Sequence, residues 1–202
     1  MAPEYKLAAE KLAGMVVVGA VDCDAEENKG LCATYGIQGF PTIKVFSAGK
    51  KGMPSDFQGQ RTAAAIVNEG ISKVRSYLKK CVAQEFDDLV ASNNKSVIVL
   101  VSEKTKVPVM FNALSAEFYD QVDFCFFKSS DAEFMKKVEI TTFPSLRLFS
   151  KDKEPVVYDG PLKFKSIKEF LEPFAINRKP RGNNKKNEKK EAPKEKTVCN
   201  FF

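Results

Sequence analysis

A tight turn that leads into a strand, in residues 35–46, constrains the fold more than any other feature of the sequence. Gly36 can adopt the left-handed backbone conformation that ends a helix, and Gly39 gives the turn conformational freedom. Pro41 precedes the run Ile-Lys-Val-Phe at 43–46, which is typical of a sheet strand. A proline that opens a strand after such a turn is a candidate for a cis peptide bond. These residues therefore predict a helix end, a cis turn and a strand in direct succession.

The same design occurs a second time in the chain. Phe143 and Pro144 again precede an alternating apolar run, and Pro144 lies 103 residues after Pro41. Repetition at a fixed distance indicates a tandem repeat. We therefore expect one domain in residues 1–81 and another in residues 82–176.

Both copies alternate helices with strands, which predicts an α/β fold. The first copy combines a helix at 1–12, a valine-rich central strand at 16–21 and a closing helix at 61–81. The second copy contains a full set of helices and strands, expected at residues 86–90, 97–101, 109–119, 122–127, 132–138, 142–149 and 166–174. The second domain is therefore predicted to be complete, and the first to lack its opening elements.

The positive charge of the chain is confined to its C-terminal end. The net charge is +6, and residues 177–202 contain nine Lys or Arg and three Glu, so the remainder is neutral. We expect a disordered, solvated basic tail there, with nuclear targeting or polyanion binding as alternatives. A neutral folded part without a recognition motif argues against a nucleic-acid partner.

Several classes of chemistry are excluded by composition. The chain has no histidine, which removes Cys-His nucleophilic catalysis and Cys2His2 zinc sites. It also has no Cys-x-x-Cys, because its cysteines are Cys23, Cys32, Cys81, Cys125 and Cys199. No apolar run approaches the roughly 20 residues that span a bilayer, and the first residues lack the layout of a secretory signal. We expect no metal, no cofactor and no membrane span.

A set of short motifs resembles the active, a-type domains of protein disulfide isomerases, which have the thioredoxin fold. The motifs are Met-Ala-Pro-Glu-Tyr at 1–5, two alanines at 8–9, Val-Asp-Cys-Asp at 21–24 and Gly-Phe-Pro at 39–41. In that family the helix that matches residues 1–12 begins at a Cys-x-x-Cys dithiol. The resemblance thus implies that this chain begins in the middle of a domain, after the dithiol.

The second copy is similar to a redox-inactive, b-type thioredoxin-like domain of the same family. Residues 102–108, Ser-Glu-Lys-Thr-Lys-Val-Pro, stand where the active domains hold the dithiol, and they offer no thiol. An active-type domain, an inactive domain and a basic tail together most resemble the small two-domain fungal disulfide isomerases of the endoplasmic reticulum. The resemblance covers about residues 1–175.

The cysteines leave several interpretations open. Eight residues separate Cys23 from Cys32, which suits a local disulfide, and some active domains of the family bridge these two positions. Two buried free thiols are the alternative. Cys125 alternates within an apolar strand and is predicted to be a buried thiol, whereas Cys81 has no assigned role. Cys199 begins a poor prenylation box, and we do not expect lipidation.

The family resemblance implies a peptide site at the first turn. It assigns substrate contact to Gly39, Phe40 and Pro41, whereas Phe143 and Pro144 are expected to form a structural turn with or without peptide contact. The implied function is that of a thiol–disulfide oxidoreductase or foldase of the secretory pathway, located in the endoplasmic reticulum lumen, with the dithiol missing from this chain. The alternative is a non-catalytic thioredoxin-fold chaperone. In both cases the expected partners are unfolded or disulfide-containing client proteins.

Overall fold

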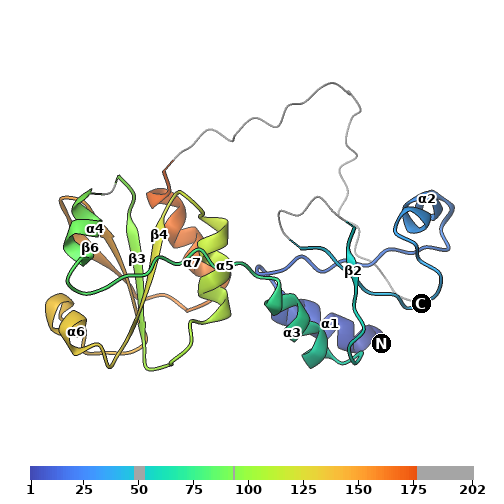
Figure 1. Cartoon of the computed structure of the whole chain (residues 1–202), viewed down its shortest axis with the longest axis horizontal. Helices are drawn as coiled ribbons and strands as arrows, with labels where there is room; N and C mark the ends of the chain where they lie inside the picture. The colour runs from blue at the N-terminus through green and yellow to red at the C-terminus, as the bar shows by residue number, and fades with distance from the viewer. Residues whose placement is uncertain (48–52, 93, 177–202) are drawn as a thin grey trace, which may run out of the picture.

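The computed structural model describes residues 1–47, 53–92 and 94–176. Figure 1 shows two separate parts, an N-terminal half (residues 1–75) and a C-terminal half (residues 76–176). The tail expected at 177–202, with Cys199 in it, lies outside the described residues.

The N-terminal half is built from helices and a small sheet. Helix α1 (Ala2–Leu12) packs against α3 (Ala63–Ser72), and α2 (Glu26–Thr34) lies at the far end of this half (Figure 1). Strand β1 (Lys44–Val45) pairs antiparallel with β2 (Ser55–Asp56). A small apolar core holds these elements together: Ala8, Ala63 and Ile66, bordered by Tyr5, Ile43, Phe57 and Val67.

Polar caps fix the start of α3. Thr62 Oγ1 accepts a hydrogen bond from the backbone N–H of Ala65 at 3.3 Å. Glu4 Oε2, on α1, accepts one from the N–H of Ala63 at 2.6 Å. Oxygen acceptors at a helix N-terminus satisfy its free N–H groups, and a carboxylate also complements the helix dipole. The two helices are therefore joined by a polar contact as well as by apolar packing.

Two predictions for this half are wrong. Residues 16–21 form no strand, and Val17 is 99% exposed and Val21 55%. Their β-branched side chains suit a strand, but no strand within the described ranges pairs with them to accept their backbone hydrogen bonds. The helix predicted at 61–81 ends at Ser72, and the chain then continues without helical structure onto the C-terminal half.

The C-terminal half contains a four-stranded sheet in the order β4-β3-β5-β6. The central strand β3 (Val97–Ser102) is parallel to β4 (Asp123–Lys128) and antiparallel to β5 (Ser145–Ser150). Strand β6 (Lys153–Tyr158) pairs antiparallel with β5 and forms one edge. The strands expected at 97–101, 122–127 and 142–149 are confirmed to within a few residues, whereas no strand was expected at 153–158.

Helices cover both faces of this sheet, as Figure 1 shows. Side chains of α5 (Val109–Glu117) and α7 (Phe164–Leu171) form a core on one face. Side chains of α4 (Phe86–Ser92) and α6 (Ala132–Val138) form a second core on the other. Strand β3 is buried along its whole length, which explains its continuous run of apolar residues. A short 3-10 helix (Glu172–Phe174) continues α7.

Residues 76–81 join the C-terminal half beside β4. The backbone N–H of Lys79 donates to the carbonyl of Phe124 at 2.8 Å. The N–H of Tyr77 donates to Ser115 Oγ at 2.9 Å. Contacts with the C-terminal half therefore begin several residues before position 82, where we expected the domain to start.

A disulfide attaches the same segment to the sheet. It joins Cys81 to Cys125, which is completely buried in β4. The prediction that Cys125 is a free buried thiol is therefore wrong. Its partner is 44 residues away in sequence, and only the fold brings the two side chains together.

A contact between Gly14 and Phe164 joins the two halves. Gly14 follows α1 with a φ of +81°, and an added Cβ there would lie 2.6 Å from Cδ1 of Phe164 on α7. Both the positive φ and the close ring favour glycine.

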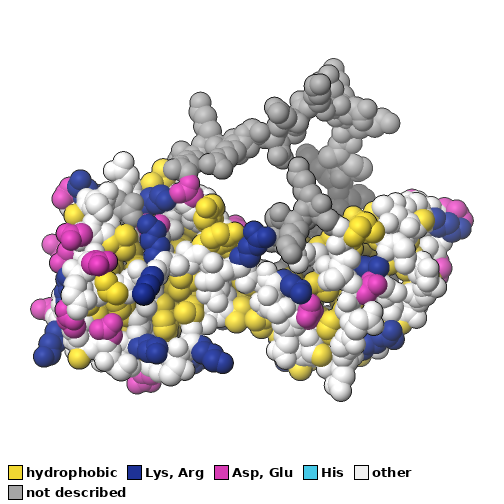
Figure 2. All heavy atoms as spheres, in the orientation of Figure 1, with side chains coloured by type: hydrophobic (Ala, Val, Ile, Leu, Met, Phe, Trp, Pro, Cys, Tyr) yellow, Lys and Arg dark blue, Asp and Glu magenta, His cyan; other side chains and the backbone are white. Residues whose placement is uncertain are grey.

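Figure 2 shows hydrophobic side chains exposed in patches between charged ones on both halves.

Candidate functional site

The first turn is held by two hydrogen bonds. The peptide bond between Phe40 and Pro41 is cis. Thr42 Oγ1 donates to the carbonyl of Gly39 at 2.6 Å. Arg61 Nη2 donates to the carbonyl of Pro41 at 3.2 Å, although no feature of the sequence singled out this arginine. The turn is therefore supported from within and from the start of the segment that leads into α3.

The end of α2 delivers the chain into this turn. Gly36 has a φ of +63°, and the N–H of Ile37 donates to the carbonyl of Cys32 at 3.0 Å. A left-handed residue after the last helical turn is the common way to end a helix. The predicted glycine helix end is confirmed.

An apolar groove of about 480 Å³ opens beside the turn. We call it the turn groove; it lies between α1, α2, residues 19–23, the turn itself and β1. Three of its large apolar side chains are well exposed: Phe40 (67%), Phe46 (59%) and Leu31 (47%). Contiguous exposed apolar surface of this kind marks a binding site more often than ordinary surface. Gly39, Phe40 and Pro41 thus lie at or beside a groove suited to apolar groups.

Tyr5 provides a polar group in the wall of the turn groove. Its hydroxyl donates to the carbonyl of Gly19 at 2.8 Å. Burial raises the pKa of Tyr5 above the usual 10.0, so the ring stays neutral under all physiological conditions. The hydrogen bond connects α1 to the irregular segment that forms one side of the groove.

A disulfide between Cys23 and Cys32 also lines the groove. Cys32 is 8% exposed and lies in the last turn of α2, where the negative end of the helix dipole disfavours a thiolate. Asp22 and Asp24 flank Cys23 and add negative charge. A reactive dithiol needs the opposite setting, with positive charge or a helix N-terminus beside the sulfur. This disulfide is therefore suited to hold the groove together rather than to exchange.

The second turn lies in the C-terminal half. The Phe143–Pro144 peptide bond is also cis, and Pro144 borders a cavity of about 360 Å³. The side chain of Phe143 packs against the core beneath α4 and α6. Ser102 and Lys104 line the cavity at the position expected for a dithiol, with the N–H of Lys104 donating to Ser102 Oγ at 3.2 Å.

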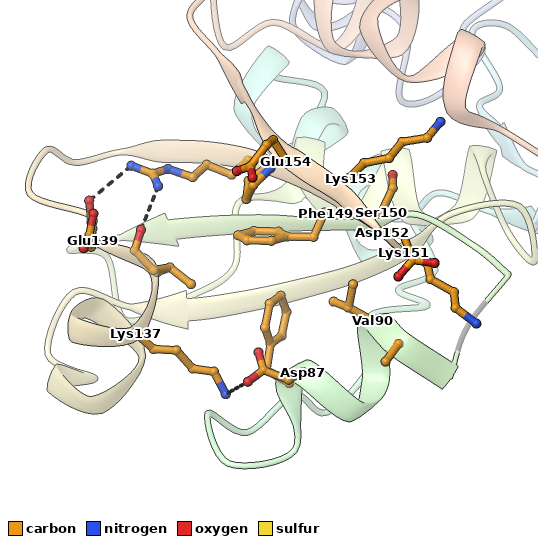
Figure 3. Close-up of a pocket in the computed structure, with 15 residues that line it drawn as sticks. Asp87, Val90, Lys137, Glu139, Phe149, Ser150, Lys151, Asp152, Lys153 and Glu154 are labelled. Atoms are coloured by element: carbon orange, nitrogen blue, oxygen red, sulfur yellow. Dashed lines mark hydrogen bonds and ion pairs between the residues drawn. The ribbon is translucent and has the colours of Figure 1, made fainter.

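A larger cavity, of about 780 Å³, lies between α4 and the β5–β6 hairpin (Figure 3). Lys137 and Asp87 form an ion pair at its rim, with 2.7 Å between Nζ and Oδ2. Arg147 donates to the backbone carbonyls of Val138 and Glu139 at 2.7 and 3.3 Å. No local motif in the sequence marks this cavity, because its residues come from separate elements.

The comparisons identify the family of the chain. The thioredoxin family model matches residues 1–71, which include the turn groove and its disulfide. A Dictyostelium discoideum protein described as a protein disulfide-isomerase is 34% identical over 180 residues, which cover 86% of this chain and 44% of that protein. The chain belongs to the protein disulfide isomerase family. A second member, protein disulfide-isomerase MPD1 of Saccharomyces cerevisiae, is 34% identical over 136 residues, or 59% of this chain and 43% of that protein.

The solved structures show the fold of this disulfide isomerase-family chain. The crystal structure of ERdj5 form II matches 84% of the chain with a TM-score of 0.53 and 19% identity, and the match covers 24% of that protein. The mixed α/β, thioredoxin-like fold expected from sequence is thereby confirmed. The chain spans less than half the length of the two disulfide isomerase relatives it matches.

Within the described residues, no group of three or more His, Cys, Asp or Glu side chains is placed to hold a metal ion. No helix in the described ranges is long and apolar enough to cross a membrane.

Proposed function

We propose that this chain binds extended segments of unfolded client proteins in the turn groove. It thereby holds clients for thiol–disulfide exchange in the secretory pathway. The observation that carries the proposal is the exposed apolar surface beside the cis turn. We assign client contact to Gly39, Phe40 and Pro41, and Phe40 with Phe46 offers aromatic surface. Unfolded clients expose the apolar side chains that such a groove accepts.

The sheet supports the same proposal. Strand β1 pairs with β2 on one side, and no strand of the described ranges occupies its other edge. An extended peptide can add to an open edge through main-chain hydrogen bonds, while alternate side chains enter the groove. Burial of an aromatic side chain is worth about 1.5–3 kcal/mol, and association itself costs at least about 4 kcal/mol. Two or three such contacts give weak, reversible binding, which suits a protein that must release its clients.

The exchange step is assigned to a dithiol that this chain does not contain. Exchange requires a thiolate of low pKa with a resolving cysteine close by. The spacing of the five cysteines provides no such pair, and the disulfide of Cys23 and Cys32 lies in an unfavourable electrostatic setting. We therefore assign the chain the client-binding step.

The proposal also specifies domains and location. It assigns residues 1–81 to an a-type domain and residues 82–176 to a redox-inactive repeat, in which Phe143 and Pro144 form a structural turn. The basic tail at 177–202 has no assigned role. Two disulfides support a location in an oxidising compartment, where such bonds persist, and we propose the lumen of the endoplasmic reticulum.

A non-catalytic chaperone is the second candidate, favoured by the lack of vicinal cysteines in this sequence. The two candidates differ in the effect that client binding has on the client. A chaperone suppresses aggregation without altering disulfides. A component of exchange raises the rate at which an added thioredoxin-fold dithiol enzyme isomerises a bound client, and this rate separates the candidates.

The binding proposal is tested by fluorescence anisotropy with a labelled, permanently unfolded client. Phe40→Ser removes the most exposed aromatic side chain of the turn groove and is expected to weaken binding about tenfold, which corresponds to about 1.4 kcal/mol. Val157→Ser is the matched control, because Val157 is 55% exposed on β6 and lies outside the groove. Equal affinities of the two variants, or an unaltered affinity of Phe40→Ser, would show that clients bind elsewhere.

A further inference from the structure

The turn before β3 contains a modification motif that client binding does not use. Residues 94–96 are Asn94-Lys95-Ser96, which fits the Asn-x-Ser acceptor sequence for N-linked glycosylation with a residue other than proline in the middle. No other asparagine of the 202 residues is followed by Ser or Thr at this distance. We infer that Asn94 carries an N-linked glycan and that the glycan is attached before the C-terminal half folds. This inference rests on the lumenal location proposed above.

The fold gives a glycan at Asn94 an open path to solvent. Asn94 is exposed, between the end of α4 and the start of β3. The next side chain, Lys95, is only half-exposed and pairs with Asp120, with 2.6 Å between Nζ and Oδ1. A sugar chain attached there needs no rearrangement of the core. A glycosylation site is expected on such a surface turn.

The acceptor hydroxyl, in contrast, is engaged in the folded domain. Ser96 Oγ lies 2.8 Å from Ser150 Oγ, and the carbonyl of Ser96 accepts a hydrogen bond from the N–H of Asp123 at 3.0 Å. Ser96 is half-buried beside two strands. The transferase must read this hydroxyl, since Ser or Thr at the third position defines the motif. The folded domain therefore hides the part of the motif that the unfolded chain presents.

The position also sets where the sugar lies. The contact between Ser96 and Ser150 places the motif beside the turn between β5 and β6. Lys151 and Asp152 of that turn line the cavity of Figure 3, together with Val90 and Ala91 of α4. A glycan on Asn94 thus stands beside this cavity, close to the point where α4 ends. The turn groove lies elsewhere, in the N-terminal half.

The modification is a group transfer without redox change. The Nδ2 atom of Asn94 forms a bond to the anomeric carbon of an oligosaccharide carried on a lipid pyrophosphate. The bond from that carbon to the pyrophosphate oxygen breaks, and the lipid pyrophosphate leaves with the electron pair. One amide proton passes to a base of the transferase.

The test is expression of the full chain behind a cleavable secretory leader, with digestion by an N-glycan-specific endoglycosidase. The leader brings the chain to the lumen whatever its natural location, so the result is independent of the client-binding proposal. We expect one glycosylated band that collapses on digestion. N94Q and S96A are expected to lose it, S96T to keep it, and N93Q to keep it as the neighbouring-asparagine control.

The order of glycosylation and folding is tested with detergent-opened, transferase-containing membranes, to which the chain is added in one of two forms. Reduced, unfolded chain is expected to be modified, and chain folded beforehand is expected to remain unmodified. A protease-protected chain in the lumen that carries no glycan would overturn the inference, as would a glycan that persists in N94Q. Equal modification of the folded and unfolded forms would overturn the proposed order of events.

Discussion

Removal of the disulfide between Cys81 and Cys125 should weaken the C-terminal half substantially. In the chain-entropy model a cross-link between residues 44 apart stabilises the fold by about 4 kcal/mol, because it restricts the unfolded chain. Cys81→Ala breaks the bond and leaves Cys125 as a buried apolar thiol, which a core tolerates. With a urea dependence of about 2 kcal/mol per M, the unfolding midpoint should fall by about 2 M.

The assay is urea unfolding followed by circular dichroism, with the disulfide of the parent verified by peptide mapping. The matched control removes the disulfide between Cys23 and Cys32, which are 9 residues apart and for which the same model gives about 2.6 kcal/mol. The control should lower the stability of the N-terminal half and leave the midpoint of the C-terminal half unaltered. If Cys81→Ala shifts that midpoint by less than about 0.5 M, the segment at 76–81 is held by its hydrogen bonds alone and the reasoning is refuted.

Three other predictions follow from the described contacts. Tyr5→Phe should remove a hydrogen bond worth about 1 kcal/mol. Because folding raises the pKa of Tyr5, its contribution to the free energy of unfolding should be constant below pH 10.0 and fall above it, and urea midpoints should show that the variant loses this alkaline decline. Hydrogen exchange should be slow in residues 97–102 and fast in residues 16–21, and equal protection would mean that the latter are paired in solution. Gly14→Ala should lower the melting temperature, whereas Gly30→Ala, inside α2 with open space around it, should raise it or leave it unchanged.

Sequence alone was sufficient for most of the C-terminal half. Strand β3 is apolar at nearly every position because it is covered on both faces, and such a run is recognisable without a structure. The repeat of the Phe-Pro turn gave the spacing of the two halves. Local patterns of this kind do not depend on what lies elsewhere in the chain.

The N-terminal half shows where local patterns mislead. Residues 16–21 have the composition of a central strand, yet a strand forms only where another strand accepts its hydrogen bonds. Composition cannot report whether that partner is present. The helix predicted at 61–81 failed for a related reason: the backbone N–H groups of Tyr77 and Lys79 donate to residues of the C-terminal half, and the helical pattern of apolar residues does not report such distant partners.

The structure of the first turn could be predicted only in part. Gly39, Phe40 and Pro41 could be named from a motif, whereas Arg61 could not, because its bond to the Pro41 carbonyl depends on how the chain returns to the turn. The disulfide of Cys81 and Cys125 was missed for the same reason. Contacts between residues far apart in sequence have no periodic signal.

Photo-crosslinking of a bound client tests the central claim most directly. A photoreactive amino acid is placed at Phe46, in the turn groove, or at Val157, on the exposed face of β6. After irradiation with an unfolded client peptide, mass spectrometry locates the cross-links. Binding in the turn groove predicts client cross-links from position 46 and not from position 157. Cross-links from position 157 alone, or equal yields from both positions, would contradict it.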